Sequence, residues 1–533
     1  MYMDETQYKV QNLVDRKRTS SYYTSYDGTS VIRPFLKEIP NREGIVLMDP
    51  FMGSSVLLSS VNDLIKPSKV IGIEINKEPC ELGRKVLSSI YDNVEVICGD
   101  AFKIAWKYKA DIIISNPPFV RWHLISNRNE ILESMISHGY GKFISRKDPG
   151  LHILSIFLID YILKEGGYAL LVIPASTFYT SQGRGLKEFL KYRYDILTLV
   201  ENVKEPSFST GSGFKELIIF LRKRKLFELH ETQTTIYQYD GNLRSLYTVN
   251  VKKVPKFLDR NWLSLFDYDN ARKVVKIIER ALEKGLLRYL SKGEILTGVE
   301  MYGPEFFFIP NKYWSVLREE EDSVLIKNQA QILSIPKRYL VKCLRKPEYY
   351  NKEIVVSNPK FYILAINDEP EGDLKKYIEW GEKQNLPALK FGDKWYQHIW
   401  KQLQTKTPYG HIFIHDKLNL TIHKILANYS EKPLCASKNF YILKENNPLI
   451  AAWFNSSIMR YILKIFSKRI SDNWTRLLEG DYLEIPVPSK SMSVDLSDIQ
   501  HAEESIREYL GLSDPLDLRK HPSDSHDYAE YEQ

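Results

Sequence analysis

The sequence has few cysteines and no long apolar segment. Its 533 residues include four cysteines (Cys80, Cys98, Cys343 and Cys435) and no CxxC pair. This spacing argues against a zinc site and predicts a reduced, intracellular protein. No window reaches the length of a membrane span, and the N-terminal run MYMDETQYKV has no apolar signal core. We therefore expect a cytoplasmic protein that does not enter a membrane.

Glycine-rich phosphate-binding motifs and internal repeats are also missing. The sequence contains neither GxGxxG nor a Walker GKS or GKT, which disfavours nucleotide-phosphate binding at a glycine loop. The net charge of +7 is mild, so it permits a polyanionic partner without requiring one. With 43% hydrophobic and 26% charged residues, the composition is that of an ordinary globular protein with more than one core.

Short apolar runs alternate with helical patterns over residues 1–225. GIVLMDP, KVIGIEI, VEVICGD, DIIISN and YALLVIP read as strands, with helical patterns between most of them. This alternation predicts an α/β fold with a doubly wound, Rossmann-like sheet. Residues 226–265 read as a connection, and residues 266–500 mix basic helices with short aromatic strands, which predicts a separate mixed α+β domain. Residues 501–533 read as a C-terminal helix and an acidic tail.

Four successive predicted strands end in residues suited to binding a small molecule. The first ends at Asp49 before a turn at Gly53, the second at Glu74, the third near Asp100, and the fourth at Asn116 in the run SNPPF. Open α/β sheets bind their ligands at the carboxyl ends of their strands. Each feature alone has an ordinary explanation as a strand–helix turn, a helix N-cap or an Asx turn. Their occurrence in this order predicts one site along the sheet edge.

In this order the motifs resemble a gamma-class (TaqI-like) S-adenosylmethionine-dependent DNA adenine-N6 methyltransferase of restriction–modification systems. SSYYTSYDGTSVIRPFLKEI resembles the family's N-terminal cofactor segment, although Ser25 stands where the family has proline. Ser55 likewise takes the place of a usual second glycine in the glycine turn. EPSFSTGSGFKELIIFLRKR resembles a further catalytic segment, and patches of the second half resemble the family's recognition domain.

The resemblance implies roles for individual residues. The catalytic group is Asn116, Pro117, Pro118 and Phe119, in which the Asn116 side-chain oxygen and the Pro117 carbonyl accept the amino hydrogens of a flipped-out adenine. Phe119 stacks on that base, and we expect Phe208, in preference to Phe214, on its other side. The expected S-adenosylmethionine contacts are Tyr23, Thr24, Asp49, Phe51, Gly53, Glu74, Ile75, Asp100, Ala101, Phe102 and Pro118.

The resemblance also assigns the domains and the partners. Residues 1–225 form the methyltransferase domain and residues 266–500 a target recognition domain for double-stranded DNA. Basic and aromatic residues interleave in LRKRK, PKRYLVKCLRK and FSKRISDNWTR, although a solvated surface explains any single cluster as well. The expected phosphate contacts are Arg222, Lys223, Arg224, Lys337, Arg338, Arg469 and Arg476, and no metal is expected.

Other readings of the NPPF motif remain open. RNA adenine-N6 methylation and protein glutamine N5 methylation use the same chemistry, although the glutamine enzymes are shorter. Intact Asn116, Pro117 and Pro118 argue against an inactive DNA-binding subunit. Only about twenty residues precede the cofactor segment, too few for a nuclease domain, and we find no PD…ExK nuclease pattern downstream. We therefore expect a methyltransferase without cleavage activity, with a separate restriction endonuclease or other defence-system subunit as a candidate partner.

Overall fold

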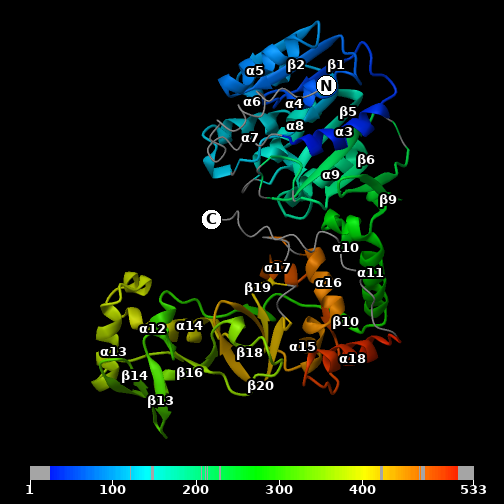
Figure 1. Ribbon diagram of the computed structural model, residues 1–533. Helices are drawn as coiled ribbons and strands as arrows, with labels where there is room; N and C mark the ends of the chain where they lie inside the picture. The colour runs from blue at the N-terminus through cyan, green and yellow to red at the C-terminus, as the bar shows by residue number, and fades with distance from the viewer. Residues whose placement is uncertain are drawn as a thin grey trace. The chain divides into compact units, whose positions relative to one another are not determined.

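The chain forms two compact units that divide between Ala271 and Arg272 (Figure 1). The computed structural model describes residues 24–120, 122–145, 149–205, 207–210, 212, 214–226, 228, 230–419, 424–466, 468–469 and 474–513. Among these residues, none of the helices combines the length and apolar character needed to cross a bilayer.

One mixed sheet organises the first unit. Within the described residues its strands are β1 (Val46–Asp49), β2 (Lys69–Glu74), β3 (Val94–Cys98), β4 (Ala110–Ser115), β5 (Leu163–Pro174), β6 (Tyr194–Asn202), β7 (Glu216–Lys223), β8 (Thr234–Tyr239) and β9 (Leu243–Val249). They lie in the order β3-β2-β1-β4-β5-β7-β6-β8-β9. β1 to β5 run parallel to their neighbours within that group, whereas β7 runs antiparallel to both β5 and β6.

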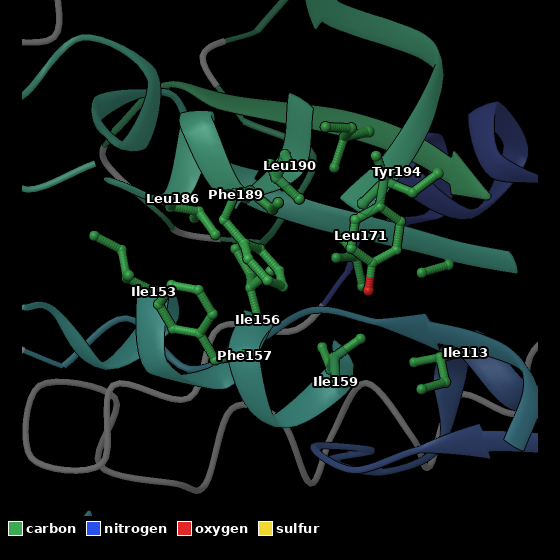
Figure 2. Close-up of a cluster of buried hydrophobic side chains, with 14 of the residues drawn as sticks. Ile113, Ile153, Ile156, Phe157, Ile159, Leu171, Leu186, Phe189, Leu190 and Tyr194 are labelled. Atoms are coloured by element: carbon green, nitrogen blue, oxygen red, sulfur yellow. The ribbon is translucent and has the colours of Figure 1, made fainter. Parts of the chain in front are cut away.

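Helices cover both faces of this sheet because its central strands are apolar on both sides. Successive side chains of a strand point to opposite faces, so Ile113 of β4 packs on one face while Ile112 and Ile114 pack on the other. The Ile113 face is covered by α7 (Arg128–Ser137), α8 (Leu151–Ile162) and α9 (Arg184–Arg193). Figure 2 shows side chains of α8 and α9 packed with Ile113 and Leu171. The other face is covered by α3 (Tyr26–Lys37), α4 (Val56–Ser59) and α5 (Lys77–Ser88). The predicted doubly wound α/β sheet is confirmed.

Residues 226–265, predicted as a connection, instead contribute two strands to the sheet. β8 pairs in parallel with β6, and β9 pairs antiparallel with β8. The run TTIYQY of β8 buries alternate residues, and Ile236 joins the core on the α8 side. This period of two is the pattern of a strand that packs one face on a core.

Two of the cysteines are bridged, contrary to the prediction of a reduced chain. Cys80 on α5 and Cys98 at the end of β3 form a disulfide with a Cα–Cα distance of 5.7 Å. Helix α5 contacts both β2 and β3, and this packing brings the two residues together. Cys343 and Cys435 are buried free thiols.

The second unit is mixed α and β, as predicted. In its described part, seven strands form one sheet in the order β11-β21-β18-β20-β16-β17-β12. Their bounds are β11 (Ile295–Thr297), β12 (Phe308–Ile309), β16 (Leu340–Leu344), β17 (Phe361–Leu364), β18 (Tyr409–His415), β20 (Ala427–Ala436) and β21 (Phe440–Leu443). The longer helices are α13 (Gly372–Glu382), α14 (His398–Lys406), α15 (Pro448–Asn455), α16 (Ser457–Phe466) and α18 (Ile499–Leu510), and α11 (Tyr268–Glu283) contains the boundary between the units. Phe306, Trp314, Tyr377 and Trp395 form part of an aromatic core.

Candidate functional site

A cavity of about 310 Å³ lies at the carboxyl ends of β1, β2, β3 and β4 in the first unit. Most of the residues predicted to bind the cofactor line it: Thr24, Asp49, Phe51, Gly53, Glu74, Ile75, Asp100, Ala101, Phe102 and Pro118, together with Asn116. Pro117 and Phe119 are not part of this lining, and Tyr23 lies outside the described residues. The structure therefore brings four strand ends, widely separated in the sequence, around one space.

Asp49 is almost fully buried at the end of β1, with 1% of its surface exposed. Its Oδ1 accepts hydrogen bonds from the Phe51 amide (2.9 Å) and from the Ser115 hydroxyl (2.6 Å). Burial raises the pKa of Asp49 to about 7, although both hydrogen bonds favour the ionised form. Asp49 is thus a carboxyl group that can gain or lose a proton near neutral pH.

Glu74 at the end of β2 holds the glycine turn in place. Its Oε2 accepts from the Gly53 amide (3.0 Å), and its Oε1 accepts from the Asn76 backbone and side-chain nitrogens (2.7 and 2.8 Å). Burial raises the pKa of Glu74, against these hydrogen bonds. A carboxylate offers about four acceptor positions, and these donors use most of them. Glu74 lines the cavity with most of its acceptor positions already used by the turn that it holds.

Asp100 at the end of β3 caps a short helix and also lines the cavity. Its Oδ1 caps α6 (Ala101–Ile104) by accepting from the Phe102 amide (2.9 Å), and its Oδ2 accepts from Asn127 Nδ2 (3.0 Å). Both Asp100 and Asn127 line the cavity. Phe102, Ile125 and Ile131 add apolar surface to the same lining. This part of the cavity suits a flat heterocycle that carries a hydrogen-bond donor.

Asn116 follows β4 directly, where the two prolines end the strand. Only 9% of its surface is exposed. Its Nδ2 donates to the hydroxyls of Ser209 (2.9 Å) and Thr24 (3.2 Å). Thr24 and Ser209 are themselves joined by an antiparallel bridge. The loop before β7, through Ser209, and the segment before α3, through Thr24, therefore fix the nitrogen end of the Asn116 side chain.

The aromatic residue beside Phe119 is Phe214, not Phe208. The Phe119 and Phe214 rings lie 5.3 Å apart at 73°, and His152 lies edge-on to Phe119 at 6.0 Å. Phe208 is fully buried in the core on the α3 side of the sheet. Its carbonyl accepts from the Ser25 amide and hydroxyl, so this turn of the chain points its ring inward. The prediction that Phe208 stacks on a base is wrong for this structure.

Most of the cations predicted to contact DNA are held by acidic groups. Arg222 pairs with Asp195 and Glu228, and Arg224 pairs with Asp195. Lys223 is 5% exposed and pairs with Asp160. The prediction is wrong for Lys223, which is buried in β7, where a charge needs a partner. Arg222 and Arg224 are partly exposed, so their phosphate contacts stay a prediction.

The remaining predicted cations lie in the second unit. Arg476 pairs with Asp416 (3.0 Å). Arg338 is exposed, with its guanidinium 4.7 Å from the centre of the Tyr339 ring, and Lys337 precedes it. The Arg469 side chain lies outside the described residues.

The two departures from the family pattern have local explanations. Ser25 caps α3 by accepting from the Gly28 amide (3.1 Å), which a proline at this position could not do. Ser55 has φ +67°, in the left-handed region where glycine is usual. The backbone therefore keeps the glycine-type turn with a serine in it.

Comparison with known proteins agrees with the geometry. Residues 60–208 match the profile of the Eco57I restriction-modification methylase family. The type II methyltransferase M.AccI of Acinetobacter calcoaceticus is 19% identical over 406 residues, which cover 71% of this chain and 68% of that protein. Among solved structures, the type IIL restriction-modification enzyme MmeI, determined in complex with DNA, superposes with a TM-score of 0.54 and 13% identity over 95% of this chain and 78% of that one.

These similarities confirm the predicted resemblance to restriction–modification methyltransferases. The matched profile contains the ends of β2, β3 and β4, with Glu74, Asp100 and Asn116. The similarity to MmeI is one of fold.

Proposed function

We propose that this chain is a site-specific DNA methyltransferase of a restriction–modification system that methylates the N6 amino group of adenine in duplex DNA. One observation carries the proposal: Asn116 and Pro118 of the NPPF motif line the same cavity as Glu74 and Asp100. A target amine bound at Asn116 is therefore next to the space in which a methyl donor would bind. The similarity to restriction–modification methylases supports DNA as the substrate class.

The cavity residues fit S-adenosylmethionine. Asp49 offers a carboxylate to the cationic end of such a molecule, Glu74 can accept a ribose hydroxyl, and Asp100 can accept from the amino group of its adenine. Phe102 and Ile75 supply apolar surface for the ring. When bound, S-adenosylmethionine supplies a methyl group on a positively charged sulfur.

The chain's own contribution to the reaction is to bind and orient the base. The amino nitrogen of adenine is a poor nucleophile because its lone pair is delocalised into the ring. The Asn116 side-chain oxygen and the Pro117 carbonyl each accept one amino hydrogen, which favours the pyramidal geometry that develops in the transition state. The proton leaves afterwards to solvent, so no strong general base is needed.

The target base must leave the duplex to reach Asn116. Phe119 stacks on the flipped base, and Phe214, which lies edge-on to Phe119 at 5.3 Å, extends this aromatic surface in place of the predicted Phe208. Stacking is worth about 1–3 kcal/mol per base, which is comparable to the cost of flipping.

Recognition of the duplex falls to the second unit in this proposal. Lys337 and the exposed Arg338 offer phosphate contacts there. A separate endonuclease is a candidate partner in the same system.

The substrate assignment is tested by incubating the purified chain with tritiated S-adenosylmethionine and either plasmid DNA, total RNA or cell protein. We expect label in DNA, on adenine after enzymatic digestion to nucleosides. Label confined to RNA or to protein glutamine would replace DNA by one of those substrates, and label on cytosine would contradict the reaction assigned to Asn116.

A further inference from the structure

The orientation of the Asn116 amide depends on what holds it. The oxygen and nitrogen ends of an asparagine amide have almost the same shape, so only the partners decide which way the group faces. Nδ2 donates to Ser209 Oγ (2.9 Å) and Thr24 Oγ1 (3.2 Å). Both hydroxyls are buried, at 5% and 3% exposure. A hydroxyl can donate or accept, so neither one fixes the amide by itself.

Glu216 fixes the direction of the Ser209 hydroxyl. It is the first residue of β7 and is fully buried. Its Oε2 accepts from the Phe208 amide (2.9 Å) and from Ser209 Oγ (2.9 Å). A backbone N–H can only donate, so Oε2 acts as an acceptor at this point. The Ser209 hydrogen is therefore directed to Glu216, and the Ser209 oxygen is left to accept from Asn116.

This chain of hydrogen bonds has one direction from Asn116 to Glu216. An accepting Ser209 oxygen requires the NH₂ end of Asn116, which turns Oδ1 away from both hydroxyls. Ser207 lies in the same loop and is also buried, but its hydroxyl donates to the carbonyls of Ser209 (2.8 Å) and Ser212 (3.4 Å). The Ser207 hydroxyl is therefore outside the chain that reaches Asn116.

We propose that Ser209 and Glu216 are positioning residues that hold the Asn116 side-chain oxygen toward the amino group of the target adenine. The inference rests on the proposed function. With the amide reversed, its NH₂ would face the amino hydrogens, donor against donor, and the help to the nucleophile would be lost. Burial raises the pKa of Glu216 to about 7. Part of the Glu216 population is therefore neutral near pH 7, and its acceptor oxygen matters more than its charge.

Four variants test the inference: Ser209→Ala, Glu216→Gln, Glu216→Leu and the control Ser207→Ala. The measurements are the single-turnover rate of methyl transfer to DNA at saturating S-adenosylmethionine, the dissociation constant of S-adenosylmethionine by calorimetry, and the thermal midpoint. Ser209→Ala should slow transfer by about 10–100-fold, the cost of a misplaced catalytic group, with cofactor affinity unchanged. Glu216→Gln should stay near the wild-type rate, because its amide oxygen can accept from both Phe208 and Ser209. Glu216→Leu offers no acceptor and should be as slow as Ser209→Ala.

Each outcome has a definite meaning. Wild-type transfer by Ser209→Ala, or equal losses in Ser209→Ala and Ser207→Ala, would overturn this inference and leave the proposed function standing. A Glu216→Gln variant as slow as Glu216→Leu would also overturn it, since the charge and not the acceptor would then matter. A wild-type chain that labels no DNA would instead contradict the proposed function and with it this role.

Discussion

Ser115→Ala removes the hydroxyl that donates to Asp49 Oδ1 at 2.6 Å in a fully buried site. The cost depends on pH because burial raises the pKa of Asp49 to about 7 from an ordinary value of 3.8. Between these values the folded protein keeps a proton that the unfolded chain has lost, so this group's contribution to stability falls as pH rises toward 7. Above 7 the carboxyl is ionised in both states, and the buried charge depends on its donors.

The magnitude follows from the charge state of the acceptor. A hydrogen bond to a charged group contributes about 1.5–3 kcal/mol and a neutral one about 0.5–1.5 kcal/mol. For a unit of this size, 1 kcal/mol corresponds to about 2–4 °C in melting temperature. We therefore expect Ser115→Ala to lower the melting temperature of the first unit by about 3–12 °C at pH about 8.5 and by about 1–6 °C at pH about 5.5.

Thermal unfolding of wild type and variant at the two pH values measures this difference. Ser155→Ala is the matched control, because its buried hydroxyl donates to the uncharged Leu151 carbonyl (2.9 Å). Its effect should be the same at both pH values. Equal shifts for Ser115→Ala at the two pH values would show that Asp49 does not ionise near neutral pH.

Three further predictions concern the cavity and the flipped base. Glu74→Gln keeps the shape of the side chain but leaves an amide NH₂ facing the Gly53 or Asn76 donors. It should therefore weaken S-adenosylmethionine binding by about tenfold, or about 1.4 kcal/mol, as measured by calorimetry. The exposed control Glu78→Gln should leave the affinity unchanged. Ser55→Gly should raise stability by about 0.5–1 kcal/mol, because relief of the left-handed φ outweighs the greater freedom of unfolded glycine; an equal gain from Ser54→Gly would contradict this. Phe214→Ala should lower kcat/KM for DNA about tenfold or more through lost stacking, whereas Phe208→Leu should chiefly lower the melting temperature.

The sheet and the cavity lining could be predicted because their signals are local. Apolar runs such as DIIIS predict buried strands. The residue after each run lies at the end of its strand, and this position does not depend on how the helices pack. Asp49, Glu74, Asp100 and Asn116 therefore meet at one edge as soon as their strands are parallel.

The errors lie where a side chain's direction depends on a distant partner. Phe208 and Phe214 stand in the same loop, and contacts of this loop with Thr24 and Ser25 hold Phe208 in the core. In the same way, Arg222 looks like a surface cation until β6 places Asp195 opposite it. The local sequence does not predict these contacts.

Ser209 and Glu216 were missed for a related reason. Both lie in the segment EPSFSTGSGFKELIIFLRKR, but the resemblance gives neither of them a role of its own. Their role depends on the hydrogen bonds from Asn116 to Ser209 and from Ser209 to Glu216. A signal was available in Glu216 itself, since an acid directly before the apolar run LIIF indicates a buried carboxyl that needs donors.

Methylation of an adenine amino group presented by Asn116 can be measured in cellular DNA. DNA from a host that expresses the chain is digested to nucleosides, and N6-methyladenine is measured by mass spectrometry for wild type, Asn116→Ala and the exposed control Asn93→Ala. We expect N6-methyladenine with wild type and Asn93→Ala and none above background with Asn116→Ala, while purified Asn116→Ala still binds S-adenosylmethionine. Equal N6-methyladenine with Asn116→Ala and wild type would contradict the role proposed for Asn116.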